Sequence, residues 1–144
     1  METILLRPVT ESDLPIFYLH QADEDAARMA GFPSRTEEAH IAHWHTIMAD
    51  ADNMLRTVVV DGEVAGNMVS FMMEGVREVG YWLGREFWGR GIASAALEQF
   101  LQEVKPRPLY AHAVKTNPGS IRVLEKCGFI LQGEDATEVT YRLD

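Results

Sequence analysis

Small residues alternate at Gly89, Gly91 and Ala93, between a strand-like run that ends at Leu83 and a helix-like run that ends near Val104. The first N–H groups of a helix have no partner inside it, and the helix dipole places partial positive charge at that end. Glycines remove the Cβ atoms that would hold an anion away from the backbone. A strand, a small-residue loop and a helix N-terminus together make an anion-binding site, which predicts a ligand that carries phosphate.

The spacing of this loop separates it from two other phosphate-binding motifs. A Walker loop ends in Gly-Lys-Ser/Thr, and no such lysine is present here. A dinucleotide fingerprint has the pattern Gly-x-Gly-x-x-Gly, of which Gly89-x-Gly91-x-x-Ser94 matches two glycines. That fingerprint also needs an acidic residue closing the next strand, and residues 109–114 end without one. A dinucleotide-binding oxidoreductase and a glycine-rich turn without a ligand are therefore the weaker alternatives.

The loop resembles the acetyl-CoA pyrophosphate loop of the GNAT N-acetyltransferases, whose motif is Gln/Arg-x-x-Gly-x-Gly/Ala. Gly91 and Ala93 take its fourth and sixth places, and Trp88 stands at its first place. An aromatic residue there is common in the subgroup that acetylates ribosomal-protein N-termini. A second segment, residues 117–129, resembles the Asn-x-x-Ser…Glu-Lys-x-Gly-Phe motif of the same subgroup. Two motifs in the right order and spacing extend the resemblance over essentially the whole chain.

The resemblance implies an enzyme that moves an acetyl group from the thioester of acetyl-CoA to a primary amine of a protein N-terminus or a small molecule. It also implies backbone pairing between one strand and the pantetheine arm, while the side chains of Tyr81 and Trp82 pack. Arg85 and Arg90, which flank the loop, and Lys115 and Arg122, which flank the second motif, are expected to supply positive charge near the anionic coenzyme. The implied cofactor-binding residues are Tyr81, Trp82, Leu83, Arg85, Trp88, Gly89, Arg90, Gly91, Ile92, Ala93, Ser94, Asn117 and Ser120.

Three side chains are candidates for the proton transfers. Glu78 lies near the carboxylate that is the general base in some family members, and its alternative is a surface glutamate in a turn beside Arg77. His112 is the other candidate base because histidine titrates near neutral pH, and its alternative is an outward-facing or satisfied histidine. Many family members protonate the leaving thiolate with a tyrosine at the position of Leu124, so the usual acid is missing. Ser120 matches the subgroup serine to which this role is assigned, but a serine at a helix start is also simply a cap.

The missing tyrosine leaves a second function open, a non-catalytic acyl-CoA-binding or sensing module of the same fold. Thiol release on addition of an amine separates this module from the enzyme. Cofactor binding separates both from a dinucleotide-binding protein. The amine acceptor itself is not readable, because residues 14–36 and 132–137, which are expected to shape its site, carry no motif.

Composition and charge set the broad class. The 144 residues, 47% of them hydrophobic, are expected to form one domain over 1–144. A net charge of −9 argues against a nucleic-acid partner and suits a cationic amine, although it equally suits solubility alone. No apolar run approaches the ~20 residues of a membrane span, and the opening Met-Glu-Thr lacks the basic region and apolar stretch of a signal peptide, so we expect a cytoplasmic protein without a membrane partner. The oligomeric state, a homodimer included, stays open.

Cysteine and histidine usage argues against thiol and metal chemistry. The single cysteine, Cys127, excludes an internal disulfide and is expected to be a small buried side chain among apolar neighbours. His40, His43 and His45 share a predicted helix, but His45 lies roughly 140° around it from His40. No nearby cysteine completes a site. We therefore expect no metal.

Hydrophobic periodicity predicts the elements that position these residues. A helical region from Thr10, with a second stretch over 23–30, is broken at residues 31–33 and resumes after a Thr36 cap. The predicted class is α/β (α+β), a GNAT-like mixed, mostly antiparallel sheet with helices on both faces, in the order β-α-α-β-β-β-α-β-α-β-β. In the family that the chain resembles, the strand before the loop and the strand after the helix splay apart around the thioester. Strands are expected at 4–6, 56–60, 63–73, 78–83, 109–114, 129–132 and 138–143, with an Asp61-Gly62 hairpin turn, and later helices at 92–104 and 119–126.

Overall fold

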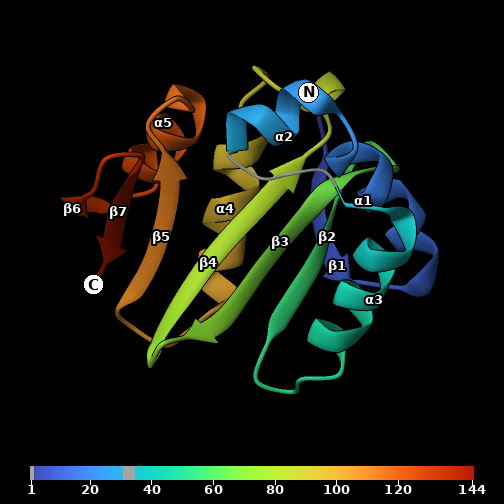
Figure 1. Ribbon diagram of the computed structural model, residues 1–144, viewed down its shortest axis with the longest axis horizontal. Coiled ribbons are helices and arrows are strands. Elements are labelled where there is room, and N and C mark those ends of the chain that lie inside the picture. The colour runs from blue at the N-terminus through green and yellow to red at the C-terminus, as the bar shows by residue number, and fades with distance from the viewer. Residues whose placement is uncertain (1, 31–34) are drawn as a thin grey trace.

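Seven strands form one mixed sheet in the order β1-β2-β3-β4-β5-β7-β6, with helices on both faces (Figure 1). This computed structural model describes residues 2–30 and 35–144. Adjacent strands are antiparallel except β4 and β5, which confirms the predicted class. The strands are β1 (Ile4–Pro8), β2 (Met54–Val60), β3 (Glu63–Met73), β4 (Val76–Leu83), β5 (Leu109–Val114), β6 (Ile130–Glu134) and β7 (Glu138–Leu143). The helices are η1 (Glu11–Asp13), α1 (Leu14–Gln21), α2 (Glu24–Ala30), α3 (Glu37–Met48), η2 (Arg85–Phe87), α4 (Ile92–Glu103) and α5 (Pro118–Lys126).

Three α-helices precede β2 in the described part of the chain, where the predicted order had two. The second helical stretch expected over 23–30 is a separate helix, α2, which has its own cap, because Asp23 Oδ1 accepts from the N–H groups of Asp25 at 3.0 Å and Ala26 at 3.2 Å. Thr36 caps α3 as predicted, through its side-chain oxygen. The predicted break at residues 31–33 lies outside the described residues. None of the described helices is long and apolar enough to cross a membrane.

Two tight turns set the register of the central strands. Asp61-Gly62 has positive φ at both residues, 49° and 85°, as a two-residue hairpin of the predicted kind requires. Glu74-Gly75 repeats this geometry with φ of 51° and 84°. The second turn therefore ends before Val76, and Arg77 and Glu78 are paired strand residues. The expectation that Arg77 lies in the turn, with Glu78 as its surface neighbour, was wrong because Glu74, a non-glycine residue, takes the first left-handed position.

The larger core lies between the sheet and α4. Alternation along β4 directs Val79 and Leu83 toward this helix, where both are 5% exposed. Each large apolar side chain buried here stabilises the fold by about 1.5–3 kcal/mol relative to an exposed one. The apolar stripe that predicts a helix over 92–104 is confirmed, and Ala93, one of its members, is half-buried. The other members are at most 9% exposed: Ile92, Ala96, Leu97, Phe100, Leu101 and, directly after α4, Val104.

The opposite face has a smaller core and buries polar groups. Its buried apolar cluster consists of Leu14 and Phe17 of α1 and Trp44 of α3. Asp13, 2% exposed, accepts two hydrogen bonds from Arg7 at 2.8 Å and one from the Thr57 hydroxyl at 2.8 Å. Burial alone would raise the pKa of Asp13, but these hydrogen bonds outweigh it and lower the pKa below its ordinary range.

His40 is a second polar group within this face. Its ring is 2% exposed, and it packs edge-on against Tyr18 and beside Trp44. Its Nδ1 atom is buried and has no hydrogen-bond partner among residues 2–30 and 35–144. Burial, together with the charge of Arg35, lowers the pKa of His40 to about 4.

Strands β4 and β5 pair for only two residues and then diverge. Arg77 pairs with Leu109 and Glu78 with Tyr110, and no further pair joins these strands. Figure 1 shows them separating toward the end of the sheet nearest α2 and α5. β5 instead pairs along its whole length with β7. The expected splay between the two strands is confirmed, and it opens the sheet beside the glycine loop.

Candidate active site

The glycine loop has the geometry expected of an anion-binding site. Gly89 and Gly91 are left-handed, with φ of 72° and 75°, and Gly91 is the N-cap of α4. A Cβ atom at either position would meet no protein atom within 4 Å. Packing within the protein therefore does not require glycine here. The backbone conformation does, and the space in front of the loop amides is open.

A pocket of roughly 620 Å³ joins this loop to the end of β4 and the start of α5. Eleven of the thirteen predicted cofactor-binding residues line it, and only Arg85 and Arg90 do not. The residues that line the pocket as predicted are Tyr81, Trp82, Leu83, Trp88, Gly89, Gly91, Ile92, Ala93, Ser94, Asn117 and Ser120.

Of the basic residues expected near the coenzyme, Arg122 lines the pocket, together with Lys126 of the same helix, whereas Lys115, Arg85 and Arg90 do not. Arg122 and Lys126 are four residues apart and so share a helix face. Their sequence signal was available, because both belong to the second motif. Ala26 of α2 also lines the pocket, and no signal in the sequence connects it to the loop about 60 residues later.

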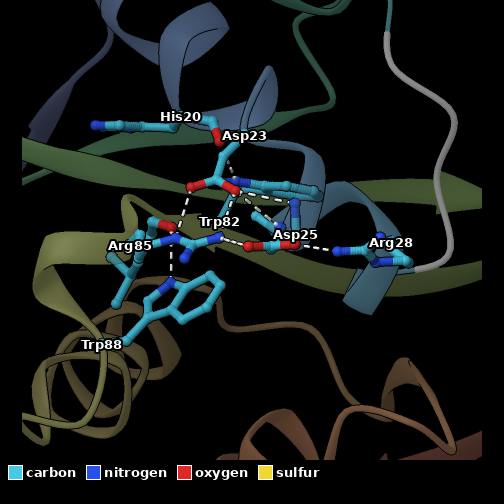
Figure 2. A network of polar contacts seen from close by, with 9 residues as sticks. His20, Asp23, Asp25, Arg28, Trp82, Arg85 and Trp88 are labelled. Carbon is cyan, nitrogen blue, oxygen red and sulfur yellow. Dashed lines mark hydrogen bonds and ion pairs between the residues drawn. The ribbon is translucent and has the colours of Figure 1, made fainter.

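Arg85 is held by carboxylates of the segment that starts α2 (Figure 2). Its Nε and Nη2 atoms donate to the two carboxylate oxygens of Asp23 at 2.7 Å, and Nη2 also donates to Asp25 at 2.6 Å. The guanidinium lies 5.6 Å from the centre of the Trp88 ring. These contacts tie α2 to the loop, and they engage the Nε and Nη2 atoms of Arg85 with carboxylates.

Arg90 is held in a similar way at the other side of the loop. Its guanidinium donates to Glu2 at 2.8 Å and 3.2 Å and to the Glu86 carbonyl at 3.1 Å, and it lies over the Phe87 ring. The phosphate contacts expected of Arg85 and Arg90 stay predictions.

The start of α5 settles which residue caps it. The Asn117 side-chain oxygen accepts a hydrogen bond from the Ser120 N–H at 3.2 Å, so Asn117 is the N-cap. The Ser120 hydroxyl is therefore not a helix cap. It accepts a hydrogen bond from the Tyr81 hydroxyl at 3.4 Å. The expectation that the Tyr81 side chain only packs was incomplete, because its polar end contacts a second pocket residue.

Glu78 and His112, the two candidate bases, form one hydrogen-bonded pair. Their Oε2 and Nε2 atoms are 3.2 Å apart, and His112 Nδ1 is 3.0 Å from the Thr140 hydroxyl. An ionised Glu78 can only accept, so Nε2 carries the proton and, in a neutral ring, Nδ1 accepts from Thr140. Glu78 is 12% exposed and His112 36% exposed. Both ring nitrogens of His112 have partners and the side chain is partly exposed, so the alternative of an outward-facing or satisfied histidine also describes it, and its role as a base stays a prediction.

The Glu78–His112 pair and the Tyr81–Ser120 pair lie on opposite faces of the sheet. Glu78 and Tyr81 are three residues apart on β4, so their side chains point to opposite faces. The last pair between β4 and β5 is at Glu78, where the strands begin to diverge. An extended ligand at the divergence can therefore meet donors on one face and a base on the other.

Three other side chains that the sequence analysis considered, those of Leu124, Cys127 and His40, pack within the fold. Leu124 is 3% exposed in the main core. Cys127 is half-buried, its thiol donates to the Ser94 carbonyl at 3.6 Å, and burial raises its pKa. His40 packs against aromatic rings as described above. No group of three His, Cys, Asp or Glu side chains in residues 2–30 and 35–144 is placed to hold a metal ion.

Known proteins share this sequence pattern and this fold. The family model described as "Acetyltransferase (GNAT) domain" matches residues 3–130. A Bacillus subtilis (strain 168) protein named "Putative ribosomal N-acetyltransferase YdaF" is 28% identical over 104 residues, which span 67% of this chain and 57% of that protein. This chain thus aligns with little more than half the length of that relative.

Solved structures agree on the fold. A GNAT-family acetyltransferase from Bacillus anthracis superposes with a TM-score of 0.82 at 22% identity, covering 97% of this chain and 93% of the other. An aminoglycoside acetyltransferase, AAC(6')-Ib, solved in complex with coenzyme A, superposes with a TM-score of 0.79 at 20% identity and the same coverage. The family match spans most of the chain, and so the chain belongs to the GNAT acetyltransferase domain family.

Proposed function

We propose that this protein is an acetyl-CoA-dependent N-acetyltransferase that acts on a primary amine. The observation that carries the proposal is the pocket in which the glycine loop, the end of β4 beyond its last pair with β5 and the start of α5 meet. Coenzyme A, which when acetylated supplies a reactive thioester, fits the chemistry of these residues. The open space in front of the left-handed glycines suits a pyrophosphate that approaches backbone amides closely.

The residues that would hold the cofactor follow from the pocket. The N–H groups of the loop and of the first turn of α4 would bind the pyrophosphate, with Arg122 and Lys126 adding positive charge. Residues 81–83, which lie beyond the last pair between β4 and β5, would pair with the pantetheine amides as an added strand does. Asn117 would contact the same arm through its amide nitrogen, since its oxygen caps α5.

Glu78 and His112 would accept the proton that an ammonium group must lose before it reacts. A lysine-like amine is neutral about 0.04% of the time at pH 7, which costs roughly 4.6 kcal/mol. A peptide α-amino group costs only about 1.4 kcal/mol. The pair is therefore needed most for side-chain or small-molecule amines. Because Thr140 fixes the His112 ring, its Nε2–H donates to one oxygen of Glu78 and stabilises the ionised carboxylate, which leaves the other carboxylate oxygen to accept the amine proton.

For the acceptor we propose only a broad class, amines that are cationic at neutral pH. The relatives differ, one being named for ribosomal acetylation and another for aminoglycosides. Both names point to amines that are cationic at neutral pH, and the protein's net charge of −9 favours the approach of such molecules. A reducing, cytoplasmic location suits the free cysteine.

A screen of amines tests this function. Peptide N-termini, polyamines, aminoglycosides and amino acids would each be incubated with acetyl-CoA while free thiol is measured. We expect at least one class to release thiol at a rate that depends on amine concentration and falls in Glu78→Gln. Binding of acetyl-CoA without turnover of any class would instead support the non-catalytic module, and no binding would contradict both.

A further inference from the structure

Tyr81 points its hydroxyl at Ser120 from across the pocket. Both residues line the pocket, and the Tyr81 O–H donates to Ser120 Oγ at 3.4 Å. Tyr81 comes from β4 and Ser120 from the first turn of α5, which are 39 residues apart in sequence. Because Asn117 is the N-cap of α5, neither hydroxyl is needed to cap the start of this helix.

We propose that Tyr81 is a positioning residue, which orients the Ser120 hydroxyl as a hydrogen-bond donor to the sulfur that leaves when the acetyl group is transferred. This inference rests on the proposed function, because it requires coenzyme A in the pocket. A hydroxyl has one donor and two acceptor positions. The bond from Tyr81 occupies one acceptor position of Ser120 and leaves the Ser120 proton for a group in the pocket. A donated bond also polarises the serine and strengthens the bond that it gives.

The pair acts by donating hydrogen bonds rather than by giving up a proton. Burial raises the pKa of Tyr81 above its ordinary value, and this outweighs the opposing effect of its bond to Ser120. An ordinary tyrosine near pKa 10 is already about thirtyfold too weak an acid to protonate a thiolate of pKa about 8.5. When the C–S bond breaks, its electron pair stays on sulfur, and the Ser120 O–H stabilises that charge. The amine proton passes to the Glu78–His112 pair, and the thiolate takes a proton from water.

This arrangement accounts for the apolar residue at position 124. A tyrosine of α5 is the expected acid in relatives of this chain, whereas Leu124 is buried in the core. The hydroxyl near the sulfur would come instead from Ser120 at the start of α5, oriented by Tyr81 of β4.

The thiol pKa of bound coenzyme A tests the proposal without a reaction. It would be measured by titrating thiolate ultraviolet absorbance in complexes of coenzyme A with wild-type protein, Tyr81→Phe, Ser120→Ala and the double variant. Tyr81→Phe should lower the acid dissociation constant of the bound thiol about tenfold, which raises its pKa by about one unit. Ser120→Ala should do at least as much. The double variant should match Ser120→Ala, since the two hydroxyls act in series.

A matched control is Tyr110→Phe, which removes a tyrosine hydroxyl outside the pocket while keeping the ring beside Arg142. It should leave the thiol pKa unchanged. The kinetic counterpart is a kcat about tenfold lower in Tyr81→Phe, with the KM for acetyl-CoA nearly unchanged.

Two outcomes are informative in opposite ways. An equal thiol pKa in wild type and Tyr81→Phe, with coenzyme A bound in both by calorimetry, would overturn the proposal while leaving the proposed function intact. Failure of the wild-type protein to bind coenzyme A at all would overturn the proposed function itself.

Discussion

The two faces of the sheet at the β4–β5 divergence present different chemical groups, backbone amides on one and polar side chains on the other. On the α4–α5 face, backbone amides of a contiguous loop lie above the larger hydrophobic core, and residues of two short motifs line much of the pocket. On the opposite face, the Glu78–His112–Thr140 group joins side chains of three strands. A ligand held by backbone can therefore be inferred from a short stretch of sequence, whereas a base assembled from side chains becomes visible only when the strands are placed together.

The largest expected effect concerns the base. Glu78→Gln keeps the size of the side chain but cannot accept a proton, so kcat at pH 7 with a lysine-like amine should fall by roughly 10²–10⁴. The loss should shrink as the pH approaches the amine pKa, because the substrate then arrives deprotonated. Steady-state rates between pH 7 and pH 10 would check this. Near-wild-type rates at pH 7 would assign the base to another group.

A stability effect distinguishes the two cores. The folded-state pKa of His40, about 4, lies below the ordinary 6.5, so the fold favours the neutral ring. This contribution is fully present above pH 6.5 and is lost as the pH falls from 6.5 toward 4, by about 3 kcal/mol in total. Denaturant unfolding at pH 7 and pH 5 should show the slope, and His40→Phe should reduce it. His20 and His43, whose pKa values burial also lowers, account for a residual slope in the same direction.

The loop backbone provides a paired test on the pocket face. Gly91→Ala adds a Cβ at φ of 75°, which strains the backbone by about 1–2 kcal/mol and fills space in front of the loop amides. Gly62→Ala adds the same strain in a hairpin at φ of 85°, also with no atom within 4 Å. Both variants should lose similar stability. Only Gly91→Ala should weaken acetyl-CoA binding, by tenfold or more, and equal affinities in the two variants would argue against phosphate binding at the loop.

The smallest effect concerns the charges around the pocket. Replacing Arg122 and Lys126 together by Ala should raise the KM for acetyl-CoA several-fold at low salt, since each exposed pair is worth at most about 1 kcal/mol. Replacing Arg85 and Arg90 should raise it less, because carboxylates already hold both. The reverse ranking would mean that the cofactor displaces Asp23 or Glu2 from these arginines.

The sequence was most informative where local chemistry decides the structure. The loop, the helix stripe of α4, the Asp61-Gly62 turn and the order of the strands follow from spacing and periodicity, and the structure confirms them. The charge assignment around the pocket could not be predicted as well, because it depends on which carboxylates pack nearby. Asp23 precedes Arg85 by 62 residues, and no pattern in either segment indicates their contact.

The same limit applies to the Tyr81–Ser120 pair and to the Glu78–His112 pair. Glu78 and His112 were alternatives in the sequence, since nothing in β4 or β5 gives their relative register; the parallel pairing of Glu78 with Tyr110 brings them within a hydrogen bond. Ser120 was equally suited to capping until Asn117 was seen to cap α5.

One calorimetric experiment tests the separation of binding from chemistry most directly. Acetyl-CoA would be titrated into wild-type protein, Glu78→Gln and Gly91→Glu, with circular dichroism to confirm that each is folded. We predict that Glu78→Gln binds acetyl-CoA as tightly as wild type while losing turnover, and that Gly91→Glu, which places a carboxylate in front of the loop amides, shows no measurable binding. Wild-type affinity in Gly91→Glu would contradict the assignment of the loop, and with it the account of the pocket as the acetyl-CoA site.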